Sequence, residues 1–500
     1  MTKRAAKLNI FRRFFGAFAA LAFSCSIGLS QNLEWSNPRK LKGSAIYSRV
    51  IGQNQDGLYV LRFRNYKSLT HNILIERYFE NLGFNVSKNI SLKKSKLLFI
   101  ELQDTGFIIF TTYYNRVDAK NEVRYQWYDK NINPIDKPRI ATTAAISDYY
   151  DKGDFRIKFS PNRERILISH TEKSEQNGRI LCFSIFDKKM RLLAYKKYEL
   201  TKSFDNFFMP DMLVDNSGNA FFMVSQHEID NKKENTPANA WVYQFNIKNK
   251  RLIDYQILDS SKNLQKTIFT FDVTKNKINL TALYTGKNPF VIEGLFNFEL
   301  PIDTAIKPKS TYKEFTPDFK RQLFGEERLT VFPDIKNFDL LEVIPNTDGG
   351  ITILAERSSV SNEEDVTYIN GMPSTTARNI YNFDDVLVFS IDSASNIRWK
   401  YLIRKSQSSL NDNGYYSSIV VANTRSNLYV LYNDRLRTNG DVMQYEFTPE
   451  GEVTYKILVR SDNNFVSIIP SEALQIGYNK LILPVTKDRK FSLLKLEYPH

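Results

Sequence analysis

The sequence has very few of the residues on which metal and redox chemistry depend. It contains two cysteines, Cys25 and Cys182, and four scattered histidines among 500 residues. Only Cys182 lies beyond the first thirty residues, so the later chain cannot form an internal disulfide and must fold through burial and hydrogen bonding. No histidines or cysteines have the spacing of zinc ligands, so we predict no metal site and no cofactor. Cys182 lies in an apolar strand-like run and is predicted to be a buried, unreactive thiol.

Recognisable catalytic motifs are also missing. There is no G-x-S-x-G elbow, phosphate-cradling glycine loop or dinucleotide fingerprint. His170 and His227 each follow a predicted strand, so we expect them at the rim of the fold, while His71 and His500 stand alone. Carboxylates are plentiful, and an acid and base pair of the glycosidase type therefore stays open as an alternative. We assign no catalytic residue, and a non-catalytic role is favoured over an enzymatic one.

Long apolar runs are confined to the N-terminus. Residues 1–30 begin with positive charges only and continue with an apolar stretch, which predicts a secretory signal peptide. Gly28 and Ser30 place the cut before Gln31. A retained membrane anchor and lipidation at Cys25 are the alternatives. We expect an exported protein of the periplasm or the outer cell surface, with no transmembrane segment after signal removal.

The charge balance is basic but gives no concentrated binding surface. Loss of the five positive charges in residues 1–30 lowers the formal net charge from +14 to +9. The remaining clusters, around Arg39 and around Lys93, are short and are typical of solvated surface. No stripe of basic residues lies beside stacked aromatics, so nucleic-acid binding is not predicted.

A repeat runs along the whole chain, in which a turn signal is followed by a short apolar strand. Each turn is rich in asparagine, aspartate, serine, glycine or proline. The predicted strands cover residues 58–63, 107–110, 165–169, 220–224, 278–283, 351–355, 428–432 and 481–485. These eight occurrences predict a repeat architecture rather than two ordinary domains.

Each repeat contains further strands with alternating apolar residues. Residues 183–187, 243–246 and 389–392 show the period of two that a strand with one buried face requires. Four antiparallel strands in each repeat predict an all-β fold, a β-propeller of about eight four-stranded blades, with seven as an alternative. The last repeat supplies only three strands, so we expect Leu33 to Leu41 to complete it. A pair of stacked β-sandwiches is the structural alternative.

Two segments interrupt the repeat within the single predicted domain of residues 31–500. Residues 304–338 contain a predicted short helix, with Thr316 as its N-cap, Pro317 at its first position and Gly325 at its end. Residues 357–383 form a long polar insertion that contains Glu363, Glu364 and Asp365. Such an insertion is either functional or a disordered, decorative loop, and the acidic residues make it a candidate binding segment.

A second candidate binding segment joins the sixth and seventh repeats, over residues 407–418. Its amides, hydroxyls and aromatic rings could hold a sugar or a peptide. The alternative is that they form turns packed between blades. Clustered oxygens at Asn411–Gly414 or Asp384–Asp385 could bind calcium, but neither run has the spacing of a calcium loop, which favours surface turns. The candidate residues are Gln407, Asn411, Asp412, Tyr415 and Tyr416.

Part of this region resembles uncharacterised exported propeller-like proteins of Gram-negative bacteria. The resemblance covers about fifty residues and depends on Asp385–Asp392, Asn396–Trp399, Lys405–Gln407 and Asp412–Tyr415. It implies an exported location and a propeller fold, and it implies no activity.

From these observations we expect a binding or scaffold propeller at the cell envelope, a monomer by itself, whose rim contacts a protein partner. Propellers suit this role because the blades form a rigid ring while the loops vary. The alternative is a propeller that binds or hydrolyses carbohydrate, with carboxylates in its central depression.

Overall fold

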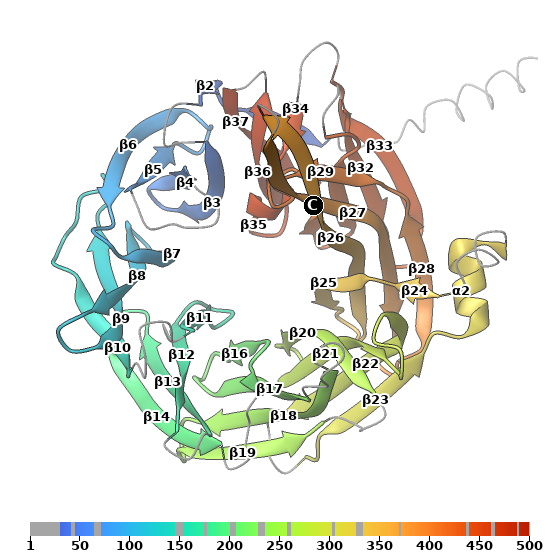
Figure 1. Cartoon of the computed structure of the whole chain (residues 1–500), viewed down its shortest axis with the longest axis horizontal. Helices are drawn as coiled ribbons and strands as arrows, with labels where there is room; N and C mark the ends of the chain where they lie inside the picture. Colours follow the sequence, from blue (N-terminus) through green and yellow to red (C-terminus); the bar gives the residue numbers. More distant parts are fainter. Residues whose placement is uncertain are drawn as a thin grey trace, which may run out of the picture.

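A computed structural model shows that the chain forms a ring of eight antiparallel sheets, each arranged as a propeller blade (Figure 1). The first strand of each blade lies near the centre of the ring and the last lies at its periphery. The structure describes residues 31–41, 46–64, 72–145, 154–174, 178–200, 207–228, 236–257, 262–302, 306–326, 334–369, 372–436, 440–461, 466–487 and 490–499. The predicted signal peptide, His71 and His500 lie outside these residues.

The first four blades follow one another along the chain. Blade 1 contains β3 (Tyr47–Asn54), β4 (Gly57–Phe63), β5 (Asn72–Tyr78) and β6 (Phe84–Ser91). Blade 2 contains β7 (Lys96–Leu102), β8 (Phe107–Asn115), β9 (Lys120–Tyr128) and β10 (Arg139–Ala145). Blade 3 contains β11 (Arg156–Phe159), β12 (Arg165–Lys173), β13 (Arg179–Asp187) and β14 (Leu192–Leu200). Blade 4 contains β15 (Phe207–Phe208), β16 (Met212–Val214), β17 (Ala220–Glu228), β18 (Thr236–Asn246) and β19 (Arg251–Gln256).

The remaining blades carry the additions to the repeat. Blade 5 contains β20 (Asn263–Asp272), β21 (Lys277–Thr285), β22 (Val291–Pro301), β23 (Lys309–Glu314) and β24 (Ile335–Lys336). Blade 6 contains β25 (Phe338–Pro345), β26 (Ile351–Ile369), β27 (Met372–Ile391), β28 (Ile397–Ile403) and β29 (Gln407–Leu410). Blade 7 contains β30 (Val420–Asn423), β31 (Leu428–Asn433), β32 (Val442–Phe447) and β33 (Val453–Val459). Blade 8 contains β34 (Val466–Ile468), β35 (Leu474–Ile476), β36 (Lys480–Lys487) and β37 (Lys490–Glu497).

An aspartate at the end of the third strand shapes the turn to the fourth in several blades. Oδ1 of Asp392 accepts hydrogen bonds from the amides of Ala394 and Asn396, at 2.9 and 2.8 Å. Asp129 and Asp187 accept equivalent bonds from residues two and four positions later. These side chains mimic a backbone turn, which is why the acidic residues that end the alternating runs mark strand ends so well.

Apolar clusters fill the space between neighbouring blades all the way around the ring. Eight buried clusters can be traced, one for each of the eight blade interfaces. The interface between blades 8 and 1 contains Val50, Leu58 and Tyr78 on one side and Phe491 and Leu493 on the other. Each large apolar side chain buried in this way contributes roughly 1.5–3 kcal/mol, so the ring is stabilised by contacts between blades as well as within them.

The N-terminal segment completes blade 8, as the sequence predicts. The strand β1 (Asn32–Trp35) pairs antiparallel with β37, and β2 (Arg39–Lys40) pairs with the same strand further along. Ser36 fixes the step between them, because its amide donates to the Leu493 carbonyl and its Oγ accepts from the Leu493 amide. Arg39 then reaches blade 1, where it forms an ion pair of 3.0 Å with the buried Glu76. The first and last parts of the chain therefore share one sheet.

The segment 304–338 contains the predicted helix. The helix α2 (Pro317–Phe324) begins after Thr316, whose Oγ1 accepts a hydrogen bond of 3.2 Å from the Phe319 amide. It ends at Gly325, which has a φ of 82°. The same segment also supplies β23, the outer strand of blade 5. No helix in the described part of the chain has the length and apolar character needed to cross a membrane.

Candidate functional site

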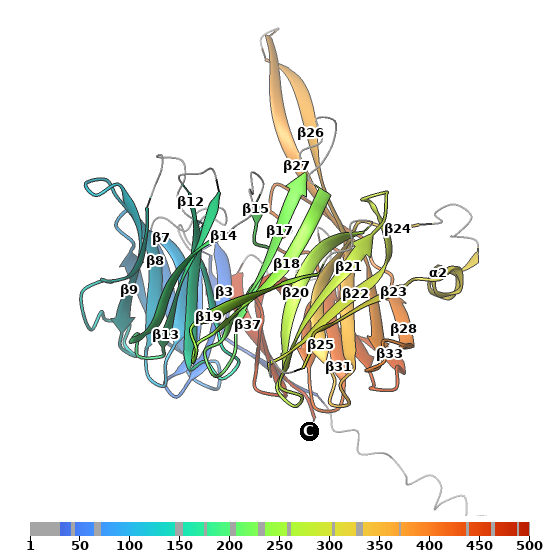
Figure 2. The same ribbon diagram turned by 90° about the horizontal axis from the view of Figure 1, so that it is seen from below.

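The insertion at 357–383 forms a long hairpin that stands away from one face of the ring (Figure 2). It consists of the outer parts of β26 and β27, which pair without interruption from Ser358 and Phe383 to Ile369 and Met372. Eleven residues beyond Ser358 span about 35 Å at the rise of a β-strand. The insertion is therefore regular structure, and the disordered alternative is not what the structure shows.

The outer hairpin exposes acidic and apolar side chains together. Glu363 and Glu364 are exposed. Val360 is 62% exposed and Met372 is 74% exposed, so both offer apolar surface to solvent. The backbone of Asp365 pairs with Thr376, and its side chain lies outside the described part of the structure.

The second predicted segment, residues 407–418, supports the base of this hairpin. β29 pairs with β27 from Phe383 to Ile380. Asn411 continues the contact, because its Oδ1 accepts from the Asn379 amide and its own amide donates to the Asn379 carbonyl, both at 2.9 Å. The structure thus brings together the two segments that the sequence singles out.

Three of the predicted binding residues are engaged inside the protein. Gln407 is buried, with its Nε2 donating to the Asn433 carbonyl at 2.6 Å. The Tyr415 hydroxyl accepts from the Ser48 amide at 2.7 Å, which links this segment to blade 1. The Tyr416 hydroxyl lies 3.2 Å from Thr486 Oγ1 in blade 8. These side chains hold blades together and are turned away from solvent.

The acidic side chains of the runs Asn411–Gly414 and Asp384–Asp385 have protein partners. Oδ1 of Asp412 accepts from Ser409 Oγ and from the Gly414 amide, at 2.6 and 2.9 Å. Asp385 forms an ion pair of 3.2 Å with Arg357, and Asp384 accepts from Ser406 Oγ at 3.1 Å. Both runs serve as turns and ion pairs at the base of the hairpin, in line with the surface-turn interpretation.

A buried ion pair lies directly beneath the hairpin. The Lys405 ammonium is 2.7 Å from Glu356 Oε1, and both side chains are only 1% exposed. Lys405 also donates to the Phe383 carbonyl and to Gln407 Oε1, while Ser418 Oγ donates to Glu356 Oε2. Burial raises the pKa of Glu356 and lowers that of Lys405, and their mutual attraction opposes both shifts. The pair fixes β28 and the following loop against β26.

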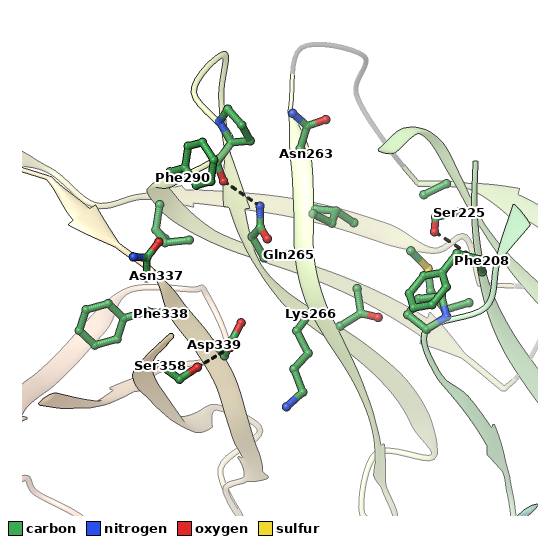
Figure 3. A pocket seen from close by; sticks show the side chains of 17 residues that line it. Phe208, Ser225, Asn263, Gln265, Lys266, Phe290, Asn337, Phe338, Asp339 and Ser358 are labelled. Carbon is green, nitrogen blue, oxygen red and sulfur yellow. Dashed lines mark hydrogen bonds between the residues drawn. The ribbon is translucent and has the colours of Figure 1, made fainter. Parts of the chain in front are cut away.

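A cleft of about 530 Å³ opens beside the hairpin base, between blades 4, 5 and 6 (Figure 3). Phe208 and Phe290 stand on opposite sides of it, 50% and 49% exposed. Gln265 lies between them, with its Nε2 donating to the Pro289 carbonyl at 3.1 Å. Ser358, from the hairpin base, donates to Asp339 Oδ2 at 2.8 Å on the blade 6 wall. Exposed aromatic rings with nearby amides form a surface that suits a sugar or a short peptide.

Sequence reasoning did not find this cleft. The residues that line the cleft come from blades 4, 5 and 6, which are far apart in the sequence. No single segment of the sequence therefore indicates a binding site here. The one local signal is Phe290, a large aromatic residue directly after Asn288-Pro289, where a turn is expected to be polar. An aromatic residue at such a position indicates either a packed loop or an exposed contact.

Carboxylates near the centre of the ring are paired with basic residues of neighbouring blades. Glu101 of β7 lies 2.8 Å from Arg163, which precedes β12. Asp211 lies 3.1 Å from Lys158 of β11, and Glu472 forms an ion pair with Arg49 of β3. These pairs connect blade 2 to 3, blade 3 to 4, and blade 8 to 1.

Glu101 gives the ring a measurable pH dependence. Burial raises its pKa from 4.5 to about 7, although Arg163 opposes the shift. The folded state therefore keeps a proton on Glu101 between pH 4.5 and 7 that the unfolded state has lost, so this group lowers stability as pH rises through that window. We expect Glu101→Gln to change the free energy of unfolding more favourably at pH 8 than at pH 4.5, by a difference of roughly 2–3 kcal/mol. Urea unfolding of both proteins at both pH values measures this difference. An effect of Glu101→Gln that is equal at the two pH values would contradict the assignment.

His170 does not lie at the rim, contrary to the sequence-based expectation. It lies within β12 and is fully buried, because β12 extends past the predicted strand end and is covered by Phe155, whose ring lies 4.8 Å from the imidazole. Cys182 is buried as predicted, and burial raises the pKa of its thiol to about 12. His227 lies in β17, where its backbone pairs with Pro237 of β18, and its side chain lies outside the described part.

The fold and this site define a β-propeller of eight four-stranded blades with a protruding hairpin and a cleft at its base. No known protein family and no curated protein matches the sequence. Among solved structures, a eukaryotic initiation factor is similar over 84% of this chain and 90% of its own, with 9% identity and a TM-score of 0.35. A mutant of the Synechocystis apocarotenoid oxygenase is similar over 94% of this chain and 95% of its own, with 9% identity and a TM-score of 0.35. An acylaminoacyl peptidase of Pyrococcus horikoshii is similar over 91% of this chain and 58% of its own, with 9% identity and a TM-score of 0.36. These likenesses carry no argument about function.

Proposed function

We propose that this protein is a non-catalytic binding propeller of the cell envelope, and that the outer part of the β26–β27 hairpin binds a protein partner. The charged and apolar composition of residues 1–30 supports export to the periplasm or the outer cell surface. The observation that carries the proposal is the hairpin itself, which extends some ten residues past the sheet and exposes Val360 and Met372. On an element that stands away from the ring, these side chains are accessible to a partner beside the exposed Glu363 and Glu364.

Charge separates the hairpin from the rest of the chain. Residues 359–382 carry three carboxylates and one arginine, whereas residues 31–500 as a whole have a formal net charge of +9. An acidic, partly apolar finger on a basic body favours a partner with a basic, partly apolar surface. Glu363 and Glu364 are the residues that we assign to this contact.

The base of the hairpin is built for rigidity, which supports a binding role. β29 adds a third strand to its lower part, the Tyr381 hydroxyl donates to Asn413 Oδ1 at 2.9 Å, and the Glu356–Lys405 pair lies beneath. A preorganised element loses little conformational entropy when it binds. Gln407, Asn411, Asp412 and Tyr415 then act as supports for the binding element.

A carbohydrate-binding role is the second candidate, and the cleft favours it. Phe208, Phe290 and Gln265 offer aromatic faces and an amide to a sugar. Among the described residues that line the cleft, Asp339 is the one carboxylate, and it accepts a hydrogen bond from Ser358. Glycoside hydrolysis generally needs two carboxylates, so binding is favoured over hydrolysis at this site.

An affinity experiment separates the two candidates. Immobilised residues 31–500 are incubated with a cell-envelope extract beside a variant in which an Asn-Gly turn replaces residues 363–378, joining the paired residues Asn362 and Asn379 and keeping the pairing with β29. We expect one stoichiometric protein to be retained by the full protein and lost with the shortened hairpin. The matched control is Phe208→Ala/Phe290→Ala, which changes the cleft and keeps the hairpin, and which should retain the protein.

Other outcomes would overturn the proposal. Equal retention by the full and shortened proteins would remove the hairpin from the contact. Retention on a polysaccharide column that is lost in Phe208→Ala/Phe290→Ala, with no protein recovered, would establish the carbohydrate role instead.

A further inference from the structure

Three side chains that commonly ligate metals meet in blade 3. Figure 1 shows β12 and β13 of this blade on the other side of the ring from β26 and β27. His170 and Glu172 lie two residues apart on β12 and so share one face of the sheet. Cys182 lies directly opposite His170 on β13. One ligand atom from each residue lies within 4.8 Å of the other two, and all three residues are buried. The group faces blade 2, because the Ala145 amide of β10 donates to Glu172 Oε1 at 2.9 Å.

The separation of two of these atoms already suits a common metal ion. His170 Nε2 and Glu172 Oε1 are 3.2 Å apart. Two ligands at 2.0–2.1 Å from a tetrahedral Zn²⁺ stand about 3.3 Å apart, and a nitrogen and a thiolate sulfur stand about 3.6 Å apart. The ligand atoms of the three residues lie within 4.8 Å of one another, so the longest separation would have to shorten by about 1 Å when an ion binds. Rotation of the Cys182 or His170 side chain would shorten it.

The two ring nitrogens of His170 have different surroundings. Nε2 lies beside Glu172 and is the atom that would bind the ion, while Nδ1 is fully buried and has no hydrogen-bond partner among the described residues. With Nε2 as the ligand, Nδ1 keeps the N–H of the neutral ring. The clustering of the three buried residues is what indicates a metal site.

We propose that His170, Glu172 and Cys182 form a binding site for a divalent transition metal ion of the zinc type. Imidazole, thiolate and carboxylate together favour Zn²⁺ over Mg²⁺ or Ca²⁺, which prefer oxygen ligands throughout. Three protein ligands leave a fourth position for water. The ion would connect β12 to β13 on the face of blade 3 that packs against blade 2.

The charges around the site are compatible with an ion. Lys197, which lies opposite Cys182 on β14, contacts Glu172 through Oε2 at 2.6 Å. Glu172 Oε1 points to His170 and is the oxygen that would bind the ion, so Lys197 can keep its contact with the other oxygen. Hydrogen-bonded partners of this kind hold ligating carboxylates in position.

Binding requires one proton to leave. Cys182 loses its thiol proton to solvent and binds as the thiolate, while neutral His170 keeps its single N–H and donates a ring lone pair. Glu172 is already ionised. Each bound ion therefore releases one proton, and no oxidation or reduction takes place.

The test uses Co²⁺ as a spectroscopic probe and Zn²⁺ as its competitor, added to chelator-treated residues 31–500, which contain Cys182 as their single thiol. We expect binding of one equivalent of Co²⁺, a thiolate-to-cobalt charge-transfer band, release of one proton per ion, and loss of the band when Zn²⁺ is added. Zn²⁺ should also raise the thermal unfolding midpoint, since it binds the folded state.

Two variants and a control decide the outcome. Cys182→Ser should abolish the band, and His170→Gln should weaken Co²⁺ binding at least about tenfold, each checked for folding by circular dichroism. Ser184→Ala, two residues from Cys182 on the same face of β13, should bind as the unchanged protein does. Absence of the band in the folded protein, or the same Co²⁺ affinity in folded His170→Gln, would overturn the proposal.

Discussion

Removal of residues 31–41 is expected to lower the free energy of unfolding by on the order of 5 kcal/mol. β1 and β2 supply the outer strand of blade 8, and Leu33 packs on the cluster between blades 7 and 8. About five backbone hydrogen bonds at about 1 kcal/mol each and a partly buried leucine account for the estimate. Without them the edge of β37 is unpaired and Glu76 loses the contact with Arg39.

This prediction is checked by thermal and urea unfolding of residues 42–500 beside residues 31–500. A synthetic peptide of residues 31–41 should restore the unfolding midpoint when it is added in excess, because it can pair with β37 in trans. The hairpin-shortened variant is the matched control, since it also loses strand residues and is expected to keep the midpoint. If residues 42–500 unfold at the same midpoint as residues 31–500, the N-terminal strand does not hold the ring together.

The substitution Lys405→Met is expected to cost about 3–5 kcal/mol of stability. Removal of the Lys405 ammonium leaves the Glu356 carboxylate buried without its cation, and an uncompensated buried charge is strongly unfavourable. The cost should be smaller at pH 4.5 than at pH 8, because burial already raises the pKa of Glu356 and the loss of Lys405 raises it further. Protonation of Glu356 at low pH then removes the unpaired charge from the folded state.

A double substitution separates the charge effect from packing. Glu356→Leu/Lys405→Met replaces both partners by apolar groups and should recover most of the stability, as other buried pairs do. Lys400→Met is the matched control, because Lys400 lies on the same strand, β28, but is bonded to Gln322 at the surface. Its effect should stay within about 0.5 kcal/mol. Urea unfolding at both pH values provides the measurement. If Lys405→Met and Lys400→Met lower the free energy of unfolding equally, the account of the buried pair is wrong.

Sequence patterns predicted the ring because its signals are local. Each second strand follows a turn that a few asparagine, aspartate or glycine residues specify, and each blade repeats the same alternation. The strand from Leu33 to Leu41 followed from the missing partner of the last repeat, and Thr316, Pro317 and Gly325 marked the helix ends. These features depend on neighbours in the chain, which the sequence displays directly.

The functional features depend on contacts that the sequence does not display. Residues 359–364 are exposed on both faces of the hairpin, so no apolar alternation identifies them as a strand. His170 lies opposite Cys182 because of the register between β12 and β13. Glu356 contacts Lys405 because the loop after β28 packs beneath the hairpin. Local patterns do not fix either arrangement.

The most direct test of the proposed function is the affinity of the retained partner for three forms of the protein. Isothermal titration would compare residues 31–500, the hairpin-shortened variant and the cleft variant Phe208→Ala/Phe290→Ala. We predict that shortening the hairpin weakens binding by at least about a hundredfold, because it removes the central contact surface, while the cleft variant binds within about twofold of the original. Unchanged affinity after the hairpin is shortened, or a loss confined to the cleft variant, would contradict the hairpin as the partner-binding element.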